Sequence, residues 1–163
     1  MLHAVVILVV TALTIMPSSD ESSPCPMNCE CNDEALSATC RENTLNEVPI
    51  TLNPRIEKLI LKQNRIKTID SASFQFYGLL QVIDFSHNQL VKVPPRVFSA
   101  QTKLLELHLN HNKLSNITDA TFFNLKSLVV LNLRNNYLEE LPDKVFSPLT
   151  SLRHLDLSQN RIQ

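Results

Sequence analysis

One pattern of apolar and polar positions recurs along most of the chain at a fixed step. Between Leu104 and Ile117 the pattern reads L-x-x-L-x-L-x-x-N-x-L-x-x-I. The same phrase begins four more times, at Ile56, Leu80, Leu128 and Leu152. The first half of each unit alternates between apolar and polar residues, which is the period of a short strand with one buried face. Because so short a strand cannot bury its leucines alone, we expect the copies to stack into a parallel sheet over one core.

Two further markers keep the same step of 24 residues. Asparagine recurs at Asn64, Asn88, Asn112, Asn136 and Asn160, and phenylalanine recurs at Phe74, Phe98, Phe122 and Phe146. Each asparagine follows a strand, where its amide can bond to backbone groups of its own loop and of the next loop, so we predict an asparagine ladder. The phenylalanines fall in the returning half of each unit and should form a spine behind the leucines.

These residues resemble the leucine-rich repeat family in its 24-residue extracellular form. The resemblance implies an α/β solenoid, a right-handed horseshoe segment with short parallel strands on its concave face. Its repeats are residues 56–79, 80–103, 104–127, 128–151 and a truncated 152–163. The departures from the pattern are Phe85 for a strand leucine, Tyr77 and Gln101 for a late leucine, and Asp70 and Thr118 for a proline. Since Gln101 is polar where the family buries a leucine, we expect a local irregularity there.

All four cysteines, Cys25, Cys29, Cys31 and Cys40, precede the repeats. After a secretory signal such a cluster favours a disulfide framework, for which spacing alone allows three pairings. Zinc is the rival interpretation, but secretion and the lack of a second close cysteine pair disfavour it. The spacing resembles the N-terminal cap of extracellular leucine-rich repeat proteins, and this resemblance implies the pairs Cys25–Cys31 and Cys29–Cys40. We assign residues 20–55 to a flexible lead and this cap, which covers the open edge of the first repeat.

The chain begins with an apolar run of 13 residues from Ala4 to Met16. That length is short for a bilayer span and suits the core of a signal peptide. We therefore assign residues 1–19 to a signal peptide with an uncertain cleavage site, with an uncleaved anchor as the alternative. Apart from this segment no membrane span is expected.

The last unit stops at Gln163, before its phenylalanine. We expect the chain to be the N-terminal part of a longer protein. The alternative is a short product whose uncapped last repeat is covered by self-association.

Composition narrows the function classes. The 163 residues suffice for one domain, and the formal net charge of −1 gives no indication of a nucleic-acid partner. Gly78 is the only glycine, which argues against phosphate-binding loops, so no nucleotide or other cofactor is expected.

Candidate binding residues lie between the strand leucines, where side chains point away from the core. The concave binding face comprises Lys62, Asp84, His87, His108, His111, Asn132, Arg134 and Asp156. Equivalent residues on adjacent strands should be about 4.8 Å apart. One row is therefore Asp84, His108, Asn132 and Asp156, and a second is Lys62, Ser86, Asn110, Arg134 and Ser158.

The histidines of this face admit three interpretations. His87 and His111 are neighbours able to share a metal ion, but no third ligand is evident. A triad of Ser86, His108 and Asp84 can be written, yet a shallow sheet offers neither an oxyanion hole nor a closed pocket. We favour a solvated polar face available to a partner, whose binding can respond to pH between 5 and 7.

Asn116-Ile117-Thr118 is a signal for N-linked glycosylation, unless it arose by chance. Asn116 should project outward just beyond the strand.

Together these features favour an extracellular protein-recognition module, secreted or on the cell surface, that binds a protein partner through the concave face. Receptor and adhesion ectodomains are implied by the resemblance, and a structural extracellular-matrix protein is the alternative. No enzymatic activity is expected.

Overall fold

The computed structural model describes residues 25–41 and 45–163. The expected signal peptide and the start of the lead that follows it lie outside the described residues. Within the described part, no helix is long and apolar enough to cross a membrane.

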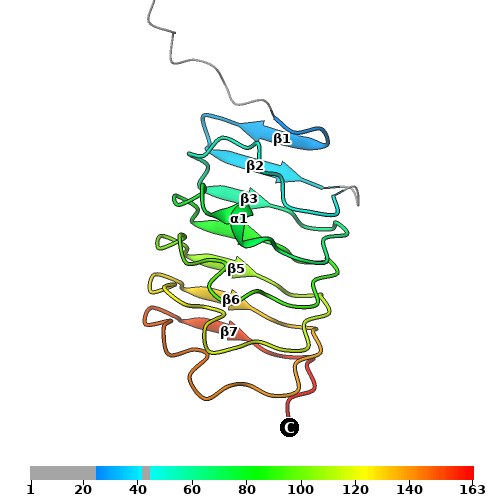
Figure 1. The fold of residues 1–163 in the computed structure, drawn as a ribbon, viewed down its shortest axis with the longest axis vertical. Coiled ribbons are helices and arrows are strands. Elements are labelled where there is room, and N and C mark those ends of the chain that lie inside the picture. The colour runs from blue at the N-terminus through cyan, green and yellow to red at the C-terminus, as the bar shows by residue number, and fades with distance from the viewer. Residues whose placement is uncertain (1–24, 42–44) are drawn as a thin grey trace, which may run out of the picture.

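Over the described residues, the backbone forms a solenoid whose seven strands stack in chain order into one sheet (Figure 1). The strands are β1 Cys29–Asn32, β2 Ser37–Cys40, β3 Lys58–Ile60, β4 Val82–Asp84, β5 Glu106–His108, β6 Val130–Asn132 and β7 His154–Asp156. The cap contributes the antiparallel pair β1 and β2, and every later neighbour pairs in parallel. From β3 onward the register advances by 24 residues a turn, as Leu59↔Ile83 and Leu107↔Leu131 show. The predicted leucine-rich repeat solenoid is confirmed.

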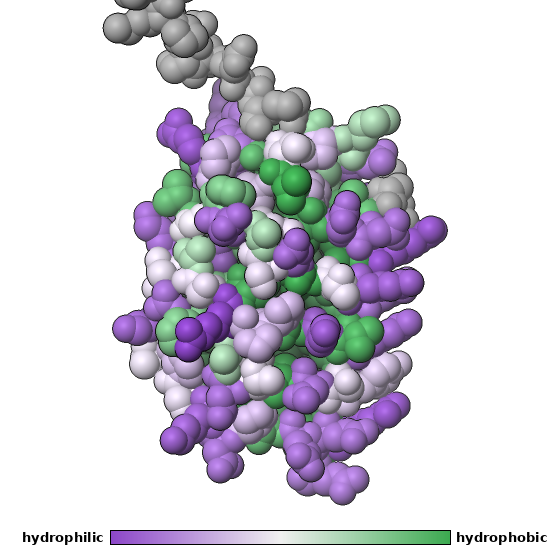
Figure 2. Space-filling view, viewed as in Figure 1, coloured by the Kyte–Doolittle hydropathy of each residue, from purple (hydrophilic) through white to green (hydrophobic). Residues whose placement is uncertain are grey.

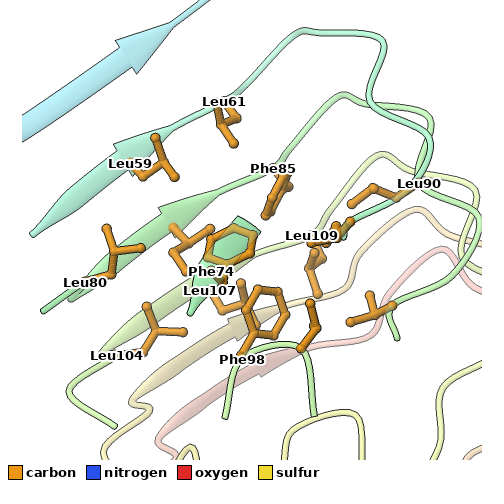
Figure 3. Packing of buried hydrophobic residues seen from close by; sticks show 14 of the residues in the cluster. Leu59, Leu61, Phe74, Leu80, Phe85, Leu90, Phe98, Leu104, Leu107 and Leu109 are labelled. Carbon is orange, nitrogen blue, oxygen red and sulfur yellow. The ribbon is translucent and has the colours of Figure 1, made fainter. Parts of the chain in front are cut away.

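The core is a continuous column of side chains that point inward from the strands and from the segments that return (Figure 3). Its central leucines, among them Leu107 and Leu109, are fully buried. Phe85, the aromatic substitute for a strand leucine, packs edge-on against Phe74 with ring centroids 5.9 Å apart. Burial of this column is the main favourable contribution to folding, since each large apolar side chain contributes about 1.5–3 kcal/mol.

The aromatic positions of the returning segments also meet one another. Phe74 and Phe98 are in edge-to-face contact at 5.4 Å, and Phe122 stacks on Phe146 at 6.1 Å. These segments are mostly turns. The one helix among the described residues, α1 Ser71–Phe74, is four residues long and is capped by the Asp70 side chain, which accepts from the Ala72 amide.

Gln101 does not disturb its turn, contrary to our expectation. Its backbone amide donates to the Phe98 carbonyl at 3.0 Å, the same bond that Leu125 makes with Phe122 one turn later. The side chain is fully buried, and its Nε2 donates to the carbonyls of Phe74 at 2.7 Å and Tyr77 at 3.2 Å. The side-chain nitrogen thus keeps the turn regular by bonding carbonyls of the preceding turn, while Oε1 is the one buried side-chain nitrogen or oxygen atom without a partner among the described residues.

The asparagines form a ladder that links each turn to the one before. Asn112 is representative. Its Nδ2 donates within its own turn to the Leu109 carbonyl and across to the Phe85 carbonyl, each at 3.0 Å, while its Oδ1 accepts from the Leu90 amide at 3.0 Å. The same arrangement holds at Asn64, Asn88, Asn136 and Asn160. Each asparagine side chain therefore bonds the preceding turn, and not the following turn as we had expected.

The residue before each ladder asparagine has a left-handed backbone. Its φ lies between 53° and 59° at Gln63, His87, His111, Asn135 and Gln159. Residues other than glycine rarely adopt this left-handed backbone conformation, and it persists only where the surrounding structure enforces it. Here the amides of the first four donate to carbonyls of the following turn, for example His87 to Asn110 at 3.0 Å. The sharp bend after each strand is therefore held by hydrogen bonds between turns.

The cap is cross-linked internally by disulfides, and the segment that follows it is hydrogen-bonded to the first repeat. Its disulfides connect Cys25 to Cys31 and Cys29 to Cys40, the pairing that the family resemblance implies. The Tyr77 hydroxyl donates to the Pro49 carbonyl at 3.2 Å and accepts from the Leu52 amide at 3.3 Å. Burial raises the pKa of this phenol, which remains a neutral donor. Tyr77 thus replaces a late leucine while bonding the segment that leads from the cap into the first repeat.

We predict that Asn112→Ala destabilises the fold by roughly 3 kcal/mol or more, because each buried backbone group left without a partner costs about 1–3 kcal/mol. The measurement is the midpoint of urea-induced unfolding followed by circular dichroism. Asn110→Ala, two residues away on the concave face, is the matched control and should shift stability by no more than about 0.5 kcal/mol. Equal losses in the two variants would contradict the role given to the ladder.

Candidate functional site

The sheet registers bring the first predicted row together on the concave face. Asp84 is the direct partner of His108, His108 of Asn132, and Asn132 of Asp156. All four are partly exposed, and in β4, β5 and β6 the residue that precedes each of them is directed into the core. This row follows from the 24-residue step, which places equivalent residues of successive turns side by side.

Short hydrogen bonds hold the side chains of this row in place. The Oδ1 atoms of Asp84 and Asn132 accept from the amides two residues later, at 2.7 Å and 3.0 Å. Asp156 Oδ1 accepts from both the amide and the hydroxyl of Ser158, at 2.9 Å and 2.6 Å. These bonds, the hydroxyl first, lower the pKa of the Asp156 carboxyl, and Arg134 adds a smaller effect in the same direction. The row is thus an ordered set of acceptors and anions, which loses little side-chain freedom when a partner binds.

The second row is less uniform. Lys62 is half-buried and Arg134 is exposed, with its Nε donating to Gln159 Oε1 at 3.3 Å. Ser86 is only 3% exposed, so it contributes little surface.

His87 and His111 stack face to face at the end of the strands. Their ring centroids are 4.2 Å apart and the planes are inclined by 8°. His111 Nδ1 lies 2.7 Å from Asn135 Nδ2, within hydrogen-bond distance of this amide. Parallel stacking directs the in-plane lone pairs of the two rings side by side, which is unsuitable for two ligands converging on one ion.

Protonation of His87 is disfavoured. Burial lowers the pKa of His87, and the positive charges of His111 and Lys62 lower it further, while Asp84 acts in the opposite direction. His87 is therefore neutral at pH 7 and gains its charge only below the usual value of 6.5.

Neither metal nor nucleophile chemistry is assembled by the described residues. Over 25–41 and 45–163, no group of three or more His, Cys, Asp or Glu side chains is placed to hold a metal ion, and the four cysteines are in disulfides. His108 Nε2 contacts Glu106 Oε2 at 3.2 Å, while the Ser86 of the conceivable triad is buried. The side chains exposed on this face are mainly polar and charged.

Three further contributors were placed on this face by the outward positions of the repeat but were not chosen as candidate binding residues, namely Glu106, Asn135 and Gln159. They lie among the outward residues and contact His108, His111 and Arg134 respectively. Alternation already places Glu106 on the same side of its strand as His108, two residues later. The other two contacts join residues 24 and 25 positions apart, so the repeat step was the available signal.

We predict that His111→Gln raises the pKa of His87 toward 6.5, because it removes the electrostatic effect of His111 on His87 and part of the ring that covers it. Asp84→Asn is the control of opposite sign and should lower the pKa of His87 further. Titration of the His87 ring resonances by NMR measures both. A His87 pKa that is unchanged in His111→Gln would show that the stack does not govern its protonation.

Comparison with known proteins agrees with this geometry. Chondroadherin-like protein of Mus musculus is 35% identical over 84 residues, which is 52% of this chain and 11% of that protein. Human lumican is 38% identical over 92 residues, covering 54% of this chain and 27% of lumican. Human reticulon-4 receptor-like 2 is 34% identical over 83 residues, covering 51% of this chain and 19% of that protein. The matched region thus spans little more than a quarter, at most, of these three relatives.

The sequence profile named leucine rich repeat matches residues 54–114 and again residues 102–162. These ranges contain strands β3 to β7 and all five ladder asparagines. Repeat step, ladder, core and profile agree, and the chain belongs to the leucine-rich repeat family.

Proposed function

We propose that this chain is an extracellular protein-recognition module that binds a protein partner through its concave face. The observation that carries the proposal is the ordered row Asp84, His108, Asn132 and Asp156 on the open side of a rigid parallel sheet. Protein binding is also the role that the leucine-rich repeat fold favours.

An apolar strip beside this row supports a protein partner. Leu105 is 38% exposed, and Val82, Val129 and Val130 are half-buried on the same face. The Val129 amide donates to the Leu105 carbonyl at 2.8 Å, so the strip crosses adjacent turns. Protein interfaces commonly combine an apolar centre with a polar rim of this kind.

The disulfides support an extracellular location, because disulfides persist in oxidising compartments. The apolar run at the N-terminus, proposed here as a signal peptide, agrees with export.

We predict that the double substitution His108→Glu with Arg134→Glu, which adds negative charge to the concave face, weakens partner binding at least about tenfold, or about 1.4 kcal/mol. Like-charge contact and desolvation at the centre of an interface cause the loss. The partner is first selected by screening the immobilised chain against a panel of purified extracellular proteins, and affinities are then measured by surface plasmon resonance.

Lys126→Glu, on an exposed returning segment, is the control and should bind almost as well as the unmodified chain. Circular dichroism must show that both variants are folded. If Lys126→Glu proved the more damaging variant, the partner would be reading the outer side of the solenoid and the concave-face proposal would fail.

We further propose that Asn116 carries an N-linked glycan. Its side chain is exposed, and its backbone forms a parallel bridge with Lys92 just beyond the strands. Chain secreted from eukaryotic cells should lose apparent mass on treatment with peptide N-glycosidase. Asn116→Gln should abolish that loss, whereas Thr118→Ser, which keeps the signal and the hydroxyl near Thr121, should retain it. Retention of the mass loss in Asn116→Gln would refute this assignment.

A further inference from the structure

The charges of this chain are segregated, although its formal net charge is only −1. Three segments that follow strands β3, β4 and β5, residues 62–68, 86–92 and 110–116, contain no Asp or Glu. Between them they hold five cations, which we term the basic edge: Lys62, Arg65, Lys67, Lys92 and Lys113. A composition near neutrality therefore conceals a local excess of positive charge.

The solenoid places these five residues on adjacent turns along one side. The Gln89 amide donates to the Ile66 carbonyl and the Lys113 amide to the Leu90 carbonyl, so the three segments run side by side. Arg65 and Lys113 hold equivalent positions two turns apart, roughly 10 Å at the spacing of strands. Figure 2 shows hydrophilic side chains projecting along the edge where, in Figure 1, the parallel strands end.

The cations of the basic edge are not neutralised by neighbours. Four of the five are exposed, and Lys62 is half-buried. Neither of the two ion pairs found among the described residues involves any of them. The edge ends at the fourth turn, where Glu139 and Glu140 hold the positions equivalent to Ser115 and Asn116. The site is therefore about three turns long and is bounded by carboxylates.

We propose that the basic edge binds a sulfated polysaccharide of the heparin class. A row of unpaired, long and flexible cations suits closely spaced sulfates, and clusters of Lys and Arg are a recognised signal for heparin. The polysaccharide would be the extracellular polyanion encountered by an exported chain, so the proposal rests on the location argued above. It does not rest on the concave face as a protein site.

Other polyanions fit the basic edge less well. Val91, 49% exposed, is the one large apolar side chain exposed on the three segments, so the edge lacks the buried aromatic or aliphatic anchor of a protein interface. The three segments contain no Phe, Tyr or Trp on which the bases of a single-stranded nucleic acid would stack. A membrane surface would call for apolar side chains that insert between lipids, and Val91 alone is a weak anchor.

The test uses the triple variant Arg65→Glu, Lys67→Glu and Lys113→Glu on immobilised heparin at about 0.15 M ionic strength. These positions are exposed and do not include the residues reversed in the concave-face experiment. The unmodified chain should bind, with an affinity that falls as salt increases, and the triple variant should bind at least about tenfold more weakly. Because the proposed glycan at Asn116 stands beside Lys92, both measurements are repeated in an Asn116→Gln background.

The matched control reverses three exposed cations elsewhere, Lys103→Glu, Lys126→Glu and Lys144→Glu, with the same change in net charge. It should retain binding. The neutral triple Arg65→Ala, Lys67→Ala and Lys113→Ala, with folding checked by circular dichroism, should also lose affinity, which separates loss of attraction from introduced repulsion.

Three outcomes would overturn the proposal. The first is that the unmodified chain does not bind heparin. The second is that the two charge-reversed triple variants lose affinity for heparin equally. The third is that the unmodified chain binds desulfated heparin, polyglutamate or phosphatidylserine vesicles as tightly as heparin. Failure here leaves the protein-binding experiment unaffected, because it measures a different ligand on different residues.

Discussion

The asparagine ladder is the interaction on which the rest of the molecule depends. The strands are three residues long in each repeat, so the chain turns away from the sheet at once and leaves backbone groups in an apolar interior. One asparagine amide bonds carbonyls of two turns, and its oxygen accepts an amide of the earlier turn. Without it, leucine burial would have to compensate for several unpaired polar groups in each turn. The ladder therefore fixes the stacking on which both proposed surfaces rely.

Most of the fold could be predicted because the sequence repeats at a step that the sheet must also obey. Given parallel pairing, a 24-residue period sets which residues are neighbours, as at Leu107↔Leu131. The expectation of a local irregularity was wrong at a position that either an apolar or a hydrogen-bonded side chain can fill. Gln101 was expected to disturb its turn. Its side-chain amide instead donates to the carbonyls of Phe74 and Tyr77, which a leucine side chain could not do. Periodicity also could not indicate that each asparagine reaches backward along the chain.

The site divides in the same way. Rows such as Asp84 and His108 follow from register, whereas the contacts within the face depend on rotamers that a repeat pattern does not encode. Stacking of His87 on His111 and the bond from Asn135 are of this second kind. They matter for chemistry, because the stacked environment lowers the pKa of His87 and the two parallel rings are poorly directed for a shared metal. The positive φ at both histidines shows that the turn, and not the side chains alone, brings the rings together.

In a solenoid, different roles fall to different positions within the repeat, and equivalent positions of successive turns form a column that shares one role. Leucine, phenylalanine and asparagine positions are committed to the core, so selection for surface chemistry acts on the remaining positions of each turn, which line up across the stack. The outward strand positions form the concave face, where an apolar strip lies beside Asp84 and Asn132. The positions just after the strands form the basic edge, where Arg65 and Lys113 align two turns apart. Because both columns are built on the same turns, a polyanion bound along the edge would stand close to a partner on the face. The spacing of the turns therefore links the two surfaces through geometry, without any change in the fold.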